Sequence, residues 1–200
     1  MQTQLKKVVI LGPESTGKST LCTQLANHFN TLWCPEYARE YLLEHGTAYS
    51  FDDLLTIAKG QLALEEKYVL SVVDCQPSAV SDAPKNLEPD SLPTTHHSRL
   101  LFLDTDMYVM KVWCEFVFGQ CHSFILNEIA ERKYDLYLLC KPDLPWVKDE
   151  LREYPDLESR EKLYHLYKDL LINQATPWAE INGGYDKRLG MAINAVESIL

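Results

Sequence analysis

The chain has 200 residues, a length that suits one domain able to bury its own core without disulfide or metal support. Hydrophobic residues make up 46% of it, which is typical of a globular protein and not of a disordered one. The formal net charge of −10 argues against broad binding to nucleic acid or to anionic membranes, which requires a basic surface. A phosphate site remains compatible with this charge, because backbone N–H groups and one or two cations can hold it.

The cysteines and the N-terminus indicate a cytoplasmic protein. No C-x-x-C pair is present, and Cys121-His122 and His96-His97 lack the spacing of zinc ligands. The chain reaches a strand-like run directly after Lys6-Lys7, with no signal peptide and no apolar stretch near the ~20 residues of a membrane helix. We therefore expect reduced thiols at all six cysteines, which are Cys22, Cys34, Cys75, Cys114, Cys121 and Cys140.

Short apolar runs alternate with segments of helical periodicity along the whole chain. Strands are expected at 8–11, 31–35, 100–103, 136–140 and 178–181. Helices are expected from Lys18 onward and at 36–45, 51–73, 105–118, 123–132, 159–175 and 185–199. This order predicts an α/β fold in a single domain over 1–200, with a five-stranded parallel sheet and helices on both faces. Residues 74–98 hold four prolines and little periodicity, so we expect a flexible insertion there.

The most specific motif is GPESTGKS at 12–19, which satisfies G-x-x-x-x-G-K-[ST] between a predicted strand and a predicted helix. Glycines allow the tight turn, and the backbone N–H groups and helix N-terminus attract phosphate oxygens. We expect Lys18 to reach the β- and γ-phosphates of a nucleotide and the Ser19 hydroxyl to ligate Mg²⁺. The predicted nucleotide-binding residues are Gly12, Pro13, Glu14, Ser15, Thr16, Gly17, Lys18, Ser19 and Thr20.

Carboxylates follow two other predicted strands. Asp104 and Asp106 come directly after the strand at 100–103, and the carboxyl ends of parallel strands open on the same crevice as the phosphate loop. We expect one of them to ligate Mg²⁺ through water or to bind a substrate hydroxyl, although Asp104 also suits a helix cap. Glu36 and Arg39 follow the strand at 31–35, and a carboxylate there is suited to orient or deprotonate an attacking hydroxyl.

Residues 142–160 are the predicted lid. They follow the fourth strand and combine prolines, Trp146 and cations, and we expect Arg152 or Arg160 to stabilise charge on a transferring phosphoryl group. A solvated charged loop is the alternative interpretation of this segment. The loop at 182–188 is expected to lie against an adenine base.

Several segments together resemble the ribosylnicotinamide kinase domain of NadR-type proteins. They are GPESTGKSTL (12–21), CPEYAREY (34–41), LFLDTD (101–106) with KVW (111–113), and PDLPWVKDELR (142–152). The resemblance implies a P-loop kinase fold and ATP- and Mg²⁺-dependent phosphorylation of nicotinamide riboside to nicotinamide mononucleotide. The chain has no H-x-G-H motif, so we do not expect a second activity that makes NAD.

The resemblance suggests roles without assigning each one to a single residue. Lys18 would hold ATP, Ser19 and Asp104 would organise Mg²⁺, and Arg152 would act in catalysis. Glu36, Asp104 or Asp106 would engage the ribose, with Arg39 nearby. A cationic ring favours an electron-rich face, so the aromatic stacking on the pyridinium would be one of Tyr37, Trp113 and Trp146.

Two other classes of function remain open at this point. The chain is alternatively another small-molecule kinase acting on a nucleoside or nucleotide, or an ATP-binding regulatory module whose hydrolysis drives a conformational change. The expected partner is a small-molecule nucleoside, with no nucleic acid and no membrane. The sequence leaves the oligomeric state open.

Overall fold

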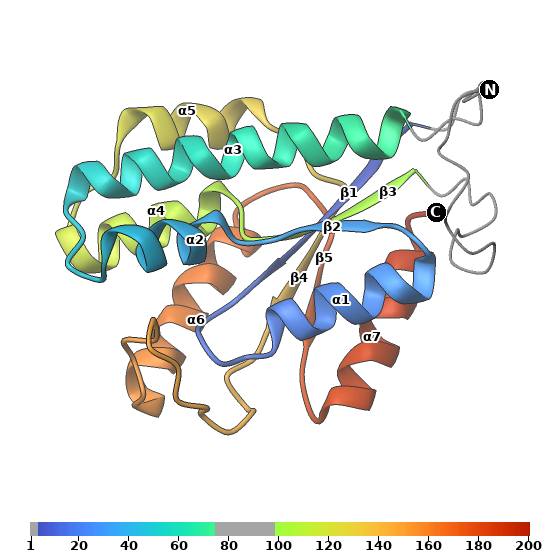
Figure 1. Cartoon of the computed structure of the whole chain (residues 1–200). Coiled ribbons are helices and arrows are strands. Elements are labelled where there is room, and N and C mark those ends of the chain that lie inside the picture. Colours follow the sequence, from blue (N-terminus) through green and yellow to red (C-terminus); the bar gives the residue numbers. More distant parts are fainter. Residues whose placement is uncertain (1–3, 75–98) are drawn as a thin grey trace, which may run out of the picture.

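The computed structural model describes residues 4–74 and 99–200. Over these ranges the chain forms one parallel sheet with helices packed on both sides of it (Figure 1). The strands are β1 (Lys6–Leu11), β2 (Leu32–Cys34), β3 (Leu100–Asp104), β4 (Leu136–Cys140) and β5 (Trp178–Ile181). The helices are α1 (Lys18–Phe29), α2 (Tyr37–His45), α3 (Phe51–Asp74), α4 (Met107–Phe118), α5 (Ser123–Glu131), α6 (Leu157–Ile172) and α7 (Tyr185–Glu197).

The sheet order is β2-β3-β1-β4-β5, with every neighbouring pair parallel. The central strand β1 pairs with β3 on one side and β4 on the other, with Val8 opposite both Phe102 and Leu136. Both faces of these strands are covered, which explains why their sequences are continuous apolar runs. All carboxyl ends therefore lie at one edge of the sheet, where β1 leads into the phosphate loop.

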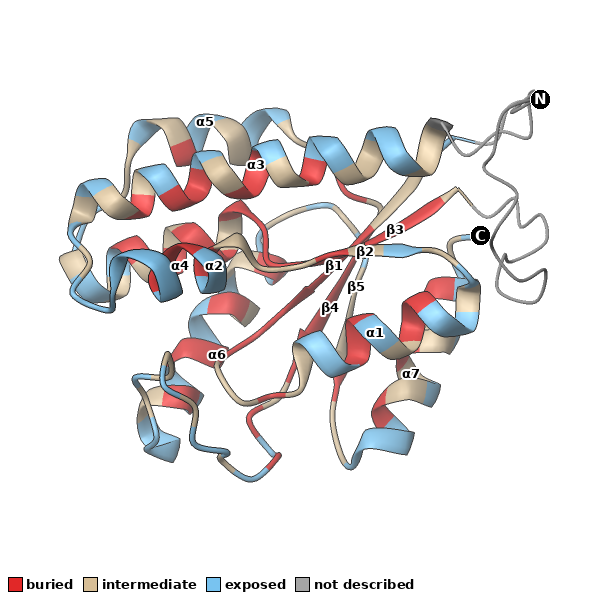
Figure 2. Ribbon diagram, viewed as in Figure 1, coloured by how far each residue is buried: buried red, intermediate tan, exposed pale blue. Residues whose placement is uncertain are grey.

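The alternating side chains of β1 enter two different cores. Val8 and Ile10 pack against α1 and α7, whereas Val9 and Leu11 pack against α4 and α6. A third cluster joins α2, α3, α4 and α5 beyond the β2 side of the sheet. Figure 2 shows the buried central strands between these helical layers. No helix in the described ranges is long and apolar enough to cross a membrane.

The five predicted strands are confirmed within two residues, and two helices begin two residues away from the expected position. The helix expected from residue 105 begins at Met107, because Thr105 has a φ of 96° and the Asp106 carboxylate caps the helix by accepting from the N–H groups of Tyr108 and Val109. The helix expected at 159–175 spans Leu157–Ile172, because Asp156 is its N-cap and accepts from the N–H of Ser159. The insertion expected at 74–98 lies outside the described residues, except for Asp74 at the end of α3.

Candidate active site

The phosphate loop connects β1 to α1 and requires glycine at its first position. Gly12 has a φ of 142°, and a Cβ atom there would lie 2.6 Å from the carbonyl oxygen of Cys140. A side chain at this position would displace the loop from the neighbouring strand. The loop also holds itself through Pro13, whose carbonyl accepts from the Thr16 hydroxyl at 2.8 Å and from the Lys18 ammonium at 3.0 Å. This bond holds the Lys18 ammonium over the phosphate loop, where we expect it to contact the phosphates.

Asp104 lies at the carboxyl end of β3 and faces the start of α1. Its Oδ2 accepts a 2.5 Å hydrogen bond from the Ser19 hydroxyl. Its Oδ1 is buried and has no hydrogen-bond partner among the described residues. Burial raises the pKa of Asp104, while the nearby Lys18 charge and the Ser19 hydroxyl act in the opposite direction. An unpartnered carboxylate oxygen beside a hydroxyl is a donor set that suits a hard cation such as Mg²⁺.

Glu36 ends the segment after β2 and precedes the first turn of α2. It is the N-cap residue of that helix, but its side chain makes no capping hydrogen bond. The Glu36 side chain is half-buried and lines a cavity. Burial, with a smaller contribution from the negative charge of Asp104, raises the pKa of Glu36 to about 7, and Lys18 opposes the shift. A carboxyl group in this range is suited to exchange a proton near neutral pH.

These groups share one cavity of about 490 Å³, a size typical of sites for small molecules. One side is the whole phosphate loop from Gly12 to Thr20. The remaining lining includes Glu36, Asp104 beside Ser19, and an aromatic and aliphatic wall. That wall and rim comprise Trp33, Pro35, Ala38, Arg39, Leu42, Val109, Trp113, Phe116, Asp149, Leu151, Arg152, Glu153, Tyr154, Leu163 and Tyr167.

The segment from Lys141 to Asp156, which forms most of the predicted lid, is irregular and docks on the phosphate loop. The Glu14 carboxylate accepts from the backbone N–H groups of Glu153 and Tyr154 at 3.1 to 3.2 Å. The Ser15 hydroxyl accepts from the N–H of Val147 at 3.0 Å. At the start of α6, Arg160 donates to the carbonyls of Glu14 and Ser15. In this structure the segment therefore closes over the loop.

Two polar bridges connect this segment to the opposite wall of the cavity. Arg39 on α2 makes two hydrogen bonds to the Asp149 carboxylate, at 3.1 and 3.2 Å. The Trp113 indole N–H donates to the Tyr49 hydroxyl at 2.9 Å, and that hydroxyl donates to Glu153 at 2.9 Å. The second bridge fixes the plane of the Trp113 ring, which borders the cavity.

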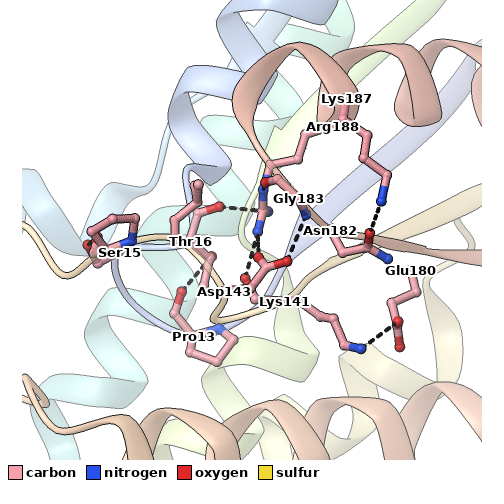
Figure 3. Close-up of polar contacts among 12 residues, drawn as sticks. Pro13, Ser15, Thr16, Lys141, Asp143, Glu180, Asn182, Gly183, Lys187 and Arg188 are labelled. Atoms are coloured by element: carbon pink, nitrogen blue, oxygen red, sulfur yellow. Dashed lines mark hydrogen bonds and ion pairs between the residues drawn. The ribbon is translucent and has the colours of Figure 1, made fainter.

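A buried arginine ties the phosphate loop to the loop after β5 (Figure 3). Arg188 is 2% exposed and donates to the carbonyls of Gly183, Thr16 and Lys141 at 2.7, 3.0 and 2.9 Å. It also forms an ion pair with Asp143, which in turn accepts from the N–H of Gly183 at 2.7 Å. One guanidinium thus joins the phosphate loop, the end of β4 and the base of the lid.

Most of the predicted site residues line the cavity, whereas Tyr37, Asp106, Trp146 and Arg160 are not part of its lining. The Tyr37 ring packs against α3 in the third core cluster. Asp106 is 2% exposed and serves as the cap of α4. Trp146 packs between the guanidinium groups of Arg152 and Arg160, each 5.8 Å from the ring centroid. Of the three aromatic residues predicted to stack on the substrate, Trp113 is therefore the one that lines the cavity.

Sequence reasoning missed two structural contributors. Arg188 was included only as part of a loop expected near adenine, and its bond to Thr16 joins residues 172 positions apart. Gln61 lies within the periodic pattern of α3, which suggested only a core-facing helix, yet it is 1% exposed and hydrogen-bonds the segment that carries Glu36. In α3 the signal was a polar residue on an otherwise apolar face.

Comparison with known proteins shows the family of the chain and several similar proteins. A family model described as an AAA domain matches residues 7–188. The trifunctional NAD biosynthesis/regulator proteins NadR of Escherichia coli (strain K12) and Salmonella typhimurium (strain LT2) are each 27% identical to the chain over 98% of its length. The chain spans 43% of the length of each of these relatives. The predicted resemblance to NadR-type proteins is thereby confirmed.

Solved structures confirm the predicted P-loop kinase fold. A crystal structure of NadR protein in complex with NR superposes with a TM-score of 0.71 at 25% identity, covering 98% of this chain and 49% of that one. A NadR structure in complex with NAD and AMP-PNP gives 0.66 at 24% identity, with coverages of 98% and 49%. Thymidylate kinase from Ehrlichia chaffeensis gives 0.64 at 13% identity, with coverages of 98% and 99%. Likeness at 13% identity shows a shared fold and no more.

Proposed function

The chain belongs to the AAA domain family, and on this premise we propose that it transfers the γ-phosphate of ATP to the 5′-hydroxyl of nicotinamide riboside. The product would be nicotinamide mononucleotide. The observation that carries the proposal is one cavity that is lined by the whole phosphate loop together with Glu36, Asp104 and Trp113. Such an arrangement holds a phosphate donor and a hydroxyl acceptor together with water excluded.

The charge of the cavity lining favours nicotinamide riboside over a phosphorylated substrate. Nicotinamide riboside has a cationic pyridinium and no phosphate, and the cavity lining outside the phosphate loop includes the carboxylates of Glu36, Asp104 and Glu153. The cation nearest to them along the chain, Arg39, is already engaged by the two oxygens of Asp149. The fixed indole of Trp113 offers an electron-rich face to a cationic ring. The complex of a NadR protein with NR supports this choice.

Each residue type has a definite task in the proposed reaction. Lys18 and the loop N–H groups would bind the β- and γ-phosphates of ATP, and Arg152, which lines the cavity from the lid, would stabilise charge on the transferring group. Asp104 and Ser19 would hold Mg²⁺, which supplies charge neutralisation on the phosphate oxygens when bound. The 5′-oxygen attacks the γ-phosphorus as the bond to the ADP oxygen breaks, and the hydroxyl proton passes to the Glu36 carboxylate.

Glu36 is preferred as the proton acceptor because the other two carboxylates have different tasks. Asp104 is bonded to Ser19 and belongs to the proposed cation site. Asp106 accepts two backbone N–H groups as a helix cap and lies outside the cavity lining. Glu36 makes no capping bond and has a pKa raised to about 7.

The test is ADP release from ATP and Mg²⁺ with and without nicotinamide riboside, with uridine, cytidine and deoxynucleosides compared in parallel. A large increase with nicotinamide riboside alone, together with nicotinamide mononucleotide as the product, is expected. A Lys18→Ala variant serves as the inactive control. Unchanged ADP release with every nucleoside, in a preparation that binds ATP, would overturn the proposal and favour a regulatory module.

A second candidate is a kinase for another nucleoside or a nucleotide. The likeness to thymidylate kinase over 99% of that chain favours it at the level of the fold. The paired state of Arg39 weighs against a nucleotide acceptor, whose phosphate would need free cations nearby. Faster turnover with a deoxynucleoside or a nucleoside monophosphate in the same assay would select this candidate.

A further inference from the structure

The N-terminus of α2 is held by a side chain from another helix. The N–H groups of a helix's first turn have no partner within the helix and need an acceptor. The residue at the cap position commonly supplies one, but Glu36 does not do so here. Instead, the N–H of Tyr37 donates to Oε1 of Gln61 on α3 at 2.7 Å.

Gln61 also holds the residues on the other side of Glu36. Its Nε2 donates to the carbonyl of Pro35 at 3.2 Å and lies 3.7 Å from the Cys34 sulfur. The side chain is 1% exposed, so its amide is committed to these partners. The backbone immediately before and after Glu36 is thus clamped by one buried amide.

Packing beside this amide is equally restrictive. Gly60 precedes Gln61 on α3, and a Cβ atom at Gly60 would lie 2.0 Å from Cε1 of the Tyr37 ring. The missing side chain lets α3 approach the start of α2 closely enough for the Gln61 amide to reach it. Position 60 and position 61 therefore act together on the same short segment.

We propose that Gln61 is a positioning residue that holds the backbone on both sides of Glu36 and thereby directs the Glu36 carboxylate into the cavity. Its Oε1 accepts from the N–H of Tyr37, the first residue of α2, and its Nε2 donates to the carbonyl of Pro35. With both neighbours held, the Glu36 side chain borders the cavity. The inference rests on the proposed function for the reaction it serves, while the clamp on the backbone is a property of the fold.

The test compares Gln61→Met with a matched variant, Gln174→Met. Gln174 makes the same pattern of bonds far along the chain, since its Nε2 donates to the carbonyls of Leu171 and Thr176 and its Oε1 accepts from the N–H of Thr176. We expect Gln61→Met to lower kcat/KM for nicotinamide riboside by about tenfold or more, because small misplacements of reacting groups are costly. The KM for ATP should stay within about twofold, since the phosphate loop is untouched. Gln174→Met should change neither constant.

A second measurement does not depend on any substrate. Amide hydrogen exchange in Gln61→Met should become faster at residues 35–41 while the exchange of α1 and the sheet stays unchanged. If the variant shows this exchange pattern but the wild-type protein shows no nucleoside-dependent turnover, the proposed function is refuted and the structural role of Gln61 stands. Unchanged exchange at 35–41, or equal losses for ATP and nucleoside, would overturn the positioning role. If Gln61→Met does not fold, Gln61→Asn, whose shorter side chain cannot reach both Tyr37 and Pro35, decides by the same criteria.

Discussion

The most informative perturbation is removal of the buried guanidinium of Arg188. Substitution by alanine leaves the carbonyls of Thr16, Lys141 and Gly183 and the carboxylate of Asp143 without their donor. Truncating one partner of a buried ion pair costs about 3–5 kcal/mol. For a chain of this size each kcal/mol corresponds to roughly 2–4 °C, so we expect the Tm to fall by roughly 6–20 °C.

The same substitution should weaken ATP binding beyond its effect on stability. Thr16 lies in the phosphate loop, and Arg188 is what ties its carbonyl to the sheet and to the base of the lid. We expect the KM for ATP to rise by about tenfold at a temperature where Arg188→Ala is fully folded, with a smaller change in the KM for the nucleoside. Arg188→Lys should recover part of the stability, because an ammonium replaces only some of the directed bonds of a guanidinium.

Thermal unfolding and steady-state kinetics measure both effects. Arg132→Ala is the matched control, because Arg132 forms ion pairs with Glu128 and Glu66 and lies outside the cavity lining. It should lower the Tm without changing the KM for ATP. If Arg188→Ala lowers the free energy of unfolding by less than about 1 kcal/mol, the buried guanidinium does not stabilise the fold as inferred. An equal rise in the KM for ATP in both variants would refute the specific link to the phosphate loop.

Three further predictions concern pH, the loop and the lid. Burial raises the pKa of Asp106 to about 7, so folding takes up a proton between about pH 4 and 7. The free energy of unfolding should therefore fall as the pH rises through that window. Denaturant unfolding at pH 5 and pH 8 should show that Asp106→Asn becomes more stable relative to wild type at pH 8. A gain at pH 5 instead would contradict the sign. Gly12→Ala should abolish ATP binding measured by calorimetry, because its Cβ would clash with Cys140. Arg39→Gln should change stability by less than about 1 kcal/mol, since the ion pair with Asp149 is exposed, but should increase ADP release without nucleoside; unchanged release would argue against a lid role for this bridge.

Most of the fold could be predicted because strands, helices and the phosphate loop each depend on a pattern of consecutive residues. The apolar run at 8–11 and the motif at 12–19 identify a strand, a phosphate loop and a helix start without any knowledge of distant partners. The helix ends were harder, since the start of α4 depends on the left-handed backbone of Thr105, a conformation that threonine rarely adopts. A β-branched residue there gives no local signal for it.

The site was predictable where residues follow strand ends and unpredictable where a contact joins distant segments. Glu36 and Asp104 line the cavity, as expected from their positions after β2 and β3. Trp146 looked equally suited to a substrate ring, but the structure places it between two arginines. Its position depends on how an irregular segment folds back, which periodicity does not encode. The role of each lining residue in catalysis stays a prediction.

The sheet order has an evolutionary consequence. Because β1 is central, the acceptor-side residues come from the β2 and β3 half of the sheet, whereas the lid and the loop after β5 come from the β4 and β5 half. Substitutions at Glu36 therefore leave the contacts of Arg188 untouched, because the two groups come from opposite halves of the sheet. An exchange of one acceptor for another would still have to keep Asp104 beside Ser19 and the Trp113–Tyr49–Glu153 bridge to the lid.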